Sequence, residues 1–165
     1  MRKSFILLGA ALAVLAATPG YAANLAAANA GATLVSAISI SNTTSLGFGQ
    51  FVASGSTGTL VMTPASARSA TGGATLGNAA GASAASFNVT GQASATYAIT
   101  LPASAILASG GNNMTVNTFT SSPSGTGALS VGGAQTITVG ATLQVGINQA
   151  QGNYSITFPV TVAYN

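Results

Sequence analysis

Hydroxyl groups are the potentially reactive side chains that this sequence offers in quantity, because serine and threonine occur throughout the chain. A serine or threonine nucleophile needs a neighbouring base to take up its proton. The sequence contains no aspartate, glutamate, histidine or cysteine, so neither that base nor the usual groups for general acid–base catalysis are available. We therefore predict no catalytic residues and no enzyme activity.

The same composition bears on metals, cofactors and nucleic acids. Zinc is bound by histidine, cysteine or carboxylate, and calcium normally needs carboxylates. The glycine-rich stretches lack the lysine and the strand–turn–helix setting of a phosphate-binding loop. One charged residue, Arg68, lies outside the N-terminal region, which is too little to bind a phosphate backbone. We predict no metal, no cofactor and no nucleic acid partner, and we expect Arg68 to be a solvated loop residue.

Residues 1–22 have the layout of a secretory signal peptide. A short basic start precedes an apolar run at residues 5–17, and this run is shorter than the roughly 20 residues of a membrane-spanning helix. Small residues follow, and they predict cleavage between Ala22 and Ala23. We expect the released protein to have no membrane span and, without cysteine, no disulfide framework.

After the signal peptide, we divide the chain into an arm at residues 23–32 and one domain at residues 33–165. The arm, ANLAAANAGA, is alanine-rich. The domain consists of short runs, several with visible alternation of apolar and polar residues, and turn-forming residues separate them. This pattern predicts an all-β sandwich or barrel. The predicted strands cover residues 33–40, 46–52, 58–63, 86–91, 95–101, 113–119, 135–145 and 152–165, whereas residues 65–85 are low in bulk and carry no strand prediction.

The last run, GNYSITFPVTVAYN, is the clearest strand signal, and we refer to residues 152–165 as the C-terminal segment. Its large side chains alternate strictly, and burying that face represents about 10 kcal/mol of gross hydrophobic stabilisation. Pro159 lacks an N–H group, which suits the edge of a sheet. An edge strand can pair within its own chain or with a strand donated by another chain. The alternating residues are Tyr154, Ile156, Phe158, Val160, Val162 and Tyr164.

The C-terminal segment resembles the end of chaperone–usher pilus subunits, which finish on an alternating strand with a penultimate aromatic residue. Tyr164 is penultimate here, and Gly152 is the fourteenth residue from the end, as in those subunits. The closing run is also similar to that of spore-coat-U-type subunits from the archaic branch of these pili. Nearly the whole released chain resembles domain-of-unknown-function family 4402. The residues that carry this resemblance are SLGFGQFV, SFNVTG, YAITLP, TVGATLQV and GNYSITFPVTVAY.

The resemblance implies an immunoglobulin-like antiparallel β-sandwich that lacks its final strand and is completed by a donated one. It implies a structural subunit of a pilus or other surface fibre, secreted through the periplasm with a periplasmic chaperone and an outer-membrane usher. Identical or related subunits would then join head to tail into an open filament. The assembly strand would be the alternating set of the C-terminal segment with Gly152 at its start.

The arm, with Leu25 and Ala27, is the candidate donor in that scheme, whereas we expect Leu34, Ile38 and Ile40 to belong to the first strand of the domain. Two alternatives remain open. One is a complete, self-sufficient monomeric surface or coat protein. The other is a carbohydrate-binding module that serves cell adhesion.

Overall fold

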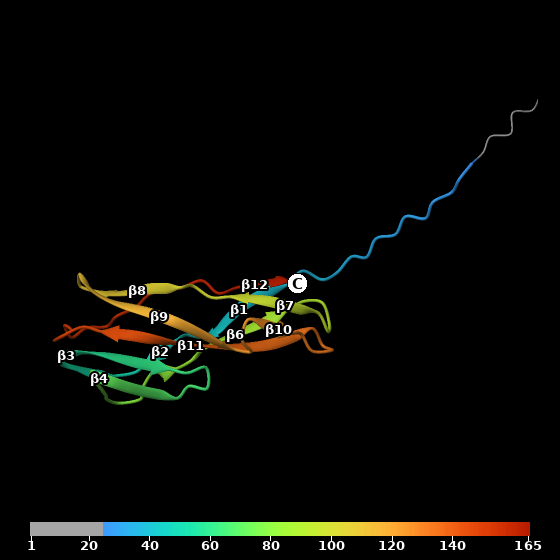
Figure 1. The fold of residues 1–165 in the computed structure, drawn as a ribbon. Coiled ribbons are helices and arrows are strands. Elements are labelled where there is room, and N and C mark those ends of the chain that lie inside the picture. The colour runs from blue at the N-terminus through green and yellow to red at the C-terminus, as the bar shows by residue number, and fades with distance from the viewer. Residues whose placement is uncertain (1–24) are drawn as a thin grey trace, which may run out of the picture. The chain divides into compact units, whose positions relative to one another are not determined.

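The computed structural model describes residues 25–165 (Figure 1). The expected signal peptide and its cleavage position between Ala22 and Ala23 lie outside the described residues, as does the start of the arm. Residues 25–33 form no helix or strand, and their side chains are exposed. Leu34–Asn165 forms a compact unit of its own.

The compact unit is an all-β, antiparallel β-sandwich, which confirms the predicted fold class. Its largest sheet has the order β1-β6-β11-β3-β4, and β8 joins it through β9, which pairs with β11. A second sheet has the order β10-β7-β12, and β2 pairs with β5. The strands are β1 (Ser39–Thr44), β2 (Gly47–Phe48), β3 (Phe51–Met62), β4 (Arg68–Leu76), β5 (Ala82–Ser83), β6 (Ala85–Thr90), β7 (Thr96–Thr100), β8 (Ser104–Ser109), β9 (Asn112–Ser122), β10 (Thr126–Ala128), β11 (Ala134–Val145) and β12 (Thr161–Tyr164).

Strand β11 links the two halves of the sandwich. Its first half pairs with β6, and its second half pairs with β3 on the same side and with β9 on the other. Gly140 lies where the partner changes, and a Cβ atom there would collide with the carbonyl oxygen of Met62. The apolar side chains of β11 alternate with threonine and glutamine, so one face of the strand is buried in both halves.

Two groups of buried side chains form the hydrophobic interior. We call the first the tyrosine core, and it consists of Ala85, Phe87, Val89, Tyr97, Ile99, Leu129, Ile137 and Val139. We call the second the methionine core, and it consists of Phe48, Leu60, Met62, Ala74, Ala84, Met114, Val116, Ala141, Leu143 and Val145.

The strands differ from the prediction at several positions, including β8, for which no strand was predicted, and β3, which is one strand where two were predicted. The first strand begins at Ser39 rather than at residue 33, so Leu34 and Ile38 lie before it. Strands β4 and β5 occupy the low-bulk stretch at residues 65–85, for which no strand was predicted. In the C-terminal segment, regular strand is limited to Thr161–Tyr164.

Candidate functional site

The C-terminal segment makes few backbone hydrogen bonds before β12. Within residues 152–160, backbone hydrogen bonds are made at Ser155. Its N–H donates to the carbonyl of Ala108 on β8, and the N–H of Ala108 donates to the carbonyl of Ser155, both at 3.4 Å. Strand β12 pairs with β7 along one edge, and no strand among the described residues pairs with its other edge. The segment is therefore held at two places and leaves backbone groups unpaired between them.

The alternating side chains of this segment are only partly buried. Tyr154 packs against the methionine core, whereas Phe158, Val160, Val162 and Tyr164 pack against the tyrosine core. Ile156 keeps 50% of its surface exposed. The ring of Phe158 also meets the ring of Phe119 from β9, with centroids 4.9 Å apart. The predicted apolar set thus contacts both cores without being fully covered.

An apolar cleft of about 1140 Å³ opens beside this segment. Residues 45–53 and residues 149–156, with Phe158, line it from two separate parts of the chain. The cleft reaches the methionine core directly, because Phe48, Met114, Val116 and Leu143 belong to both. Leu107 and Phe119 complete its apolar lining.

The strand residues along the cleft also have a free backbone edge. Phe51, Val52 and Ala53 pair with β4 on one side. Strand β11 pairs with β3 only from Gly58 onward, so no described strand pairs with the other edge of residues 51–53. The cleft therefore lies between two stretches of chain that both have unpaired backbone groups. Such an arrangement can accept an additional strand, whose main chain would satisfy the free N–H and C=O groups.

Arg68 is not the solvated loop residue that we expected. It is the first residue of β4, it is half-buried, and its guanidinium donates hydrogen bonds to backbone carbonyl groups on two loops. Nη1 lies 2.9 Å from the carbonyl oxygen of Phe48 and 3.4 Å from those of Gln50 and Asn78, and Nη2 lies 3.1 Å from that of Gly77. The expectation was wrong because the partners are backbone groups, which leave no mark in the pattern of residue types.

Two tyrosine hydroxyls make hydrogen bonds in the half of the sandwich that contains the tyrosine core. The hydroxyl of Tyr97 donates to Oε1 of Gln135 at 2.6 Å, and burial raises the pKa of this phenol above its usual value of 10.0. The hydroxyl of Tyr164 donates to the carbonyl of Ser36 at 2.8 Å and accepts from the N–H of Gln92 at 2.6 Å. The penultimate tyrosine therefore ties the C-terminal strand to the chain just before β1.

Gly152, predicted as the first residue of the assembly strand, is exposed and lines the cleft. A Cβ atom at this position would lie 2.5 Å from Oγ of Ser109, so the glycine allows close approach to the end of β8. Leu25 and Ala27, the candidate donor residues, are exposed and belong to no strand. Sequence reasoning missed two further exposed apolar residues, Leu34 and Val35, because the run at residues 33–40 was assigned to the first strand of the domain.

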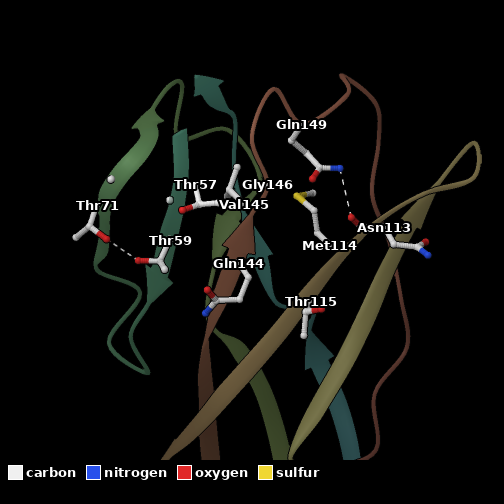
Figure 2. A pocket seen from close by; sticks show the side chains of 12 residues that line it. Thr57, Thr59, Thr71, Asn113, Met114, Thr115, Gln144, Val145, Gly146 and Gln149 are labelled. Atoms are coloured by element: carbon white, nitrogen blue, oxygen red, sulfur yellow. Dashed lines mark hydrogen bonds between the residues drawn. The ribbon is translucent and has the colours of Figure 1, made fainter. Parts of the chain in front are cut away.

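A smaller polar pocket of about 440 Å³ lies where β3 and β4 approach β9 and β11 (Figure 2). Thr59 and Thr71 share a hydrogen bond of 2.6 Å, and Nε2 of Gln149 donates to the carbonyl of Asn113 at 3.3 Å. The lining groups are uncharged hydroxyls and amides, which can exchange hydrogen bonds with a neutral ligand. No aromatic ring lines this pocket.

The part of the chain that the structure describes contains no cluster of histidine, cysteine or carboxylate residues that could hold a metal ion. The same residues include no helix of sufficient length and hydropathy to cross a membrane.

The comparison with protein families identifies a family for this chain. The model described as "Domain of unknown function (DUF4402)" matches residues 38–164. Searches of curated proteins and of solved structures found no match, so the likeness to spore-coat-U-type pilus subunits stays a prediction. The matched region covers most of the chain and includes every strand from β1 to β12. The protein therefore belongs to the DUF4402 family.

Proposed function

We propose that this protein is a structural subunit of a secreted cell-surface fibre, and that the fibre is built head to tail by strand donation. In this proposal, residues 25–35 of one copy, which we call the N-terminal segment, dock into the cleft of the next copy. The observation that carries the proposal is the apolar cleft with unpaired backbone on both sides, at residues 51–53 and 156–160.

The cleft suits a strand better than a small ligand. Main-chain hydrogen bonds to the two free edges would provide affinity, and alternate side chains of the added strand would contact the apolar lining. The residues of that lining that belong to the methionine core are Phe48, Met114, Val116 and Leu143.

The N-terminal segment has the features of a donor. Residues 25–35 form no strand, and they present Leu25 at 94% exposure, Leu34 at 99% and Val35 at 51%. Neither this segment nor the cleft lining contains a charged side chain. Burial of these apolar groups would therefore require no charge to lose its hydration.

Donation between copies uses two different surfaces, so each added subunit leaves a new cleft or a new segment free. Such heterologous contacts produce an open filament. In an unassembled subunit, the open edges invite unwanted pairing, which gives a periplasmic chaperone and an outer-membrane usher a physical role. The chaperone would cover the cleft before assembly. At the usher, the donor segment of the next subunit would then replace the chaperone.

The test uses two substitutions in the donor segment. We expect Leu25→Asp combined with Leu34→Asp to abolish multimers on native gels of surface extracts. The two positions are nine residues apart and face opposite sides of an extended strand, so whichever side meets the lining, one carboxylate would enter it at a large cost. Electron microscopy of the same cells should show loss of filaments. The folded subunit should still be secreted, since both side chains are exposed.

Val131→Asp is the matched control, because Val131 is 91% exposed and lines neither pocket. It should leave the multimers intact. Multimers that persist unchanged in the donor double variant would refute strand donation, and a wild-type chain that forms neither multimers nor filaments would refute the fibre itself.

One observation favours the self-sufficient monomer as a second candidate. Every buried side-chain nitrogen and oxygen in the described region has a hydrogen-bond partner, so the sandwich satisfies its interior polar groups by itself. The monomer predicts cooperative refolding without a partner and no affinity for a synthetic peptide of residues 25–38. The fibre subunit predicts saturable binding of that peptide.

A further inference from the structure

Residues 47–53 form one lip of the cleft, and the backbone of residues 77–78 makes hydrogen bonds to this lip. The N–H of Gln50 donates to the carbonyl of Asn78, and the N–H of Gly77 donates to the carbonyl of Gln50, both at 2.9 Å. The loop at residues 77–78 therefore supports the lip, and because Gly77 itself lines the cleft, the position of this loop affects the shape of the cleft.

Arg68 joins these two parts through a convergence of carbonyl groups. Two of its acceptors, Phe48 and Gln50, belong to the lip, and two, Gly77 and Asn78, belong to the supporting loop. Carbonyl oxygens that point toward one place repel one another unless a donor or a cation lies between them. The sequence contains no aspartate or glutamate, so the groups that bind the charged end of Arg68 are backbone dipoles and not a side-chain carboxylate.

Gly49 makes this arrangement possible. Its φ angle of +70° lies in the left-handed region that glycine adopts without strain. A Cβ atom at this position would collide with Nη1 of Arg68 and would lie 3.0 Å from the Cβ of Ala82. Gly49, the second glycine of the SLGFGQFV run, therefore provides both the turn of the lip and the space for the guanidinium.

We propose that Arg68 is a positioning residue that preorganises the lip at residues 47–53 for strand docking. This inference rests on the proposed function of the cleft. A planar guanidinium can donate to four carbonyls on two loops, whereas the ammonium of lysine is a compact group with three donors. Arg68 belongs to neither core, so its loss should change the lip more than the packed interior.

The binding experiment uses the full chain carrying Leu25→Asp and Leu34→Asp, because this protein cannot donate and its own cleft stays free. A peptide of residues 25–38 is titrated into it by calorimetry at a temperature at which every variant is folded by circular dichroism. We expect Arg68→Met to weaken binding about tenfold, since binding must then also order the lip. Arg68→Lys should fall between Arg68→Met and the parent, and Ser69→Ala, which changes the neighbouring exposed side chain, should bind like the parent.

Amide hydrogen exchange on the same proteins, without peptide, separates the two proposals. If Arg68 holds the lip, the amides of Gln50 and Gly77 exchange faster in Arg68→Met, whereas those of Ile137 and Val139 in the tyrosine core keep the exchange rates of the parent. Unchanged exchange at Gln50 and Gly77, or peptide affinity equal to that of the parent, would overturn the role of Arg68. Failure of the peptide to bind the parent would refute the proposed function, and the exchange rates would still decide whether Arg68 orders the lip.

Discussion

The tyrosine core and the methionine core share strand β11 but differ in how they are closed. The tyrosine core is covered by its own chain: Tyr97 is fully buried, and Tyr164 binds both Ser36 and Gln92 at its edge. The methionine core instead opens into the cleft, where several of its side chains form the lining. Both cores are buried, and we call the tyrosine-core half complete and the other half open because the methionine core borders the cleft, which has free backbone for an added strand.

This difference shows how a small sandwich can remain folded and yet keep an acceptor site. The complete half supplies stability through closely packed side chains and satisfied hydroxyl groups. The open half keeps backbone edges unpaired, and Arg68 adds hydrogen bonds to a lip whose Phe48 and Phe51 pack in or against the methionine core. Measurements of stability can test this division. They are best made on the protein that carries Leu25→Asp and Leu34→Asp, so that assembly does not affect the result.

The largest contrast should come from two substitutions on β11 itself. Ile137 lies in the tyrosine core, and Leu143 lies in the methionine core at the cleft; both are almost fully buried. We expect Ile137→Ala to fall near the top of the range of about 2–5 kcal/mol for such truncations and Leu143→Ala near the bottom, because side chains beside the cleft can relax into the space that the truncated Leu143 leaves. Urea denaturation measures both. Equal losses would contradict the division into a complete and an open half.

A smaller contrast is expected between two tyrosine hydroxyls. Tyr97→Phe removes a buried hydrogen bond to Gln135, whose Oε1 still accepts from the N–H of Ala128 at 2.9 Å. The acceptor is not left unsatisfied, so we expect a loss of about 1 kcal/mol. Tyr154 lies at the cleft, where its hydroxyl donates to the carbonyl of Ala150 at 2.7 Å. Water can replace that bond, so Tyr154→Phe should change the free energy of unfolding by less than about 0.5 kcal/mol.

The smallest effect should be that of pH. Acid denaturation arises mainly from carboxylates and histidines, and the sequence has neither, so we expect the melting temperature to be nearly constant from about pH 4 to about pH 9. Burial raises the pKa of Tyr97 above 10.0 in the folded state. As the pH rises past about 10, the unfolded chain loses this proton while the folded chain keeps it, so stability falls.

Melting curves across the pH range check this prediction, and Tyr97→Phe should reduce the alkaline decline. A marked loss of stability between pH 4 and pH 6 would contradict it. So would an alkaline decline of the same size in Tyr97→Phe, because it would place the alkali-sensitive group outside the tyrosine core.

The sequence was most informative where bulky residues alternate. The predicted run at residues 135–145 corresponds to β11, and those at 86–91 and 95–101 correspond to β6 and β7 with small shifts in their ends. In these strands one face is buried in a core, so alternation and structure have the same cause. The all-β class could therefore be predicted from the sequence.

Other features depend on the backbone and left no such pattern. Strand β4 consists largely of small residues, and its pairing with β3 requires glycine: a Cβ atom at Gly73 would collide with the carbonyl of Ser56. In the C-terminal segment, alternation predicted a strand, but pairing requires a neighbour, and residues 156–160 have none among the described residues. The position of Arg68 depends on where four carbonyls converge, and only a three-dimensional structure contains that information.

The position of Arg68 also affects how this protein can be detected. Trypsin cuts after lysine and arginine, and Arg68 is the only such residue in the chain beyond Lys3. In the folded protein it is half-buried at the start of a paired strand, whereas proteases prefer exposed, flexible loop tips. Even after complete denaturation, the single cut leaves fragments too long for routine peptide mass spectrometry. Protein surveys that rely on tryptic digestion will therefore underestimate its abundance, and digestion with elastase or chymotrypsin will reveal it.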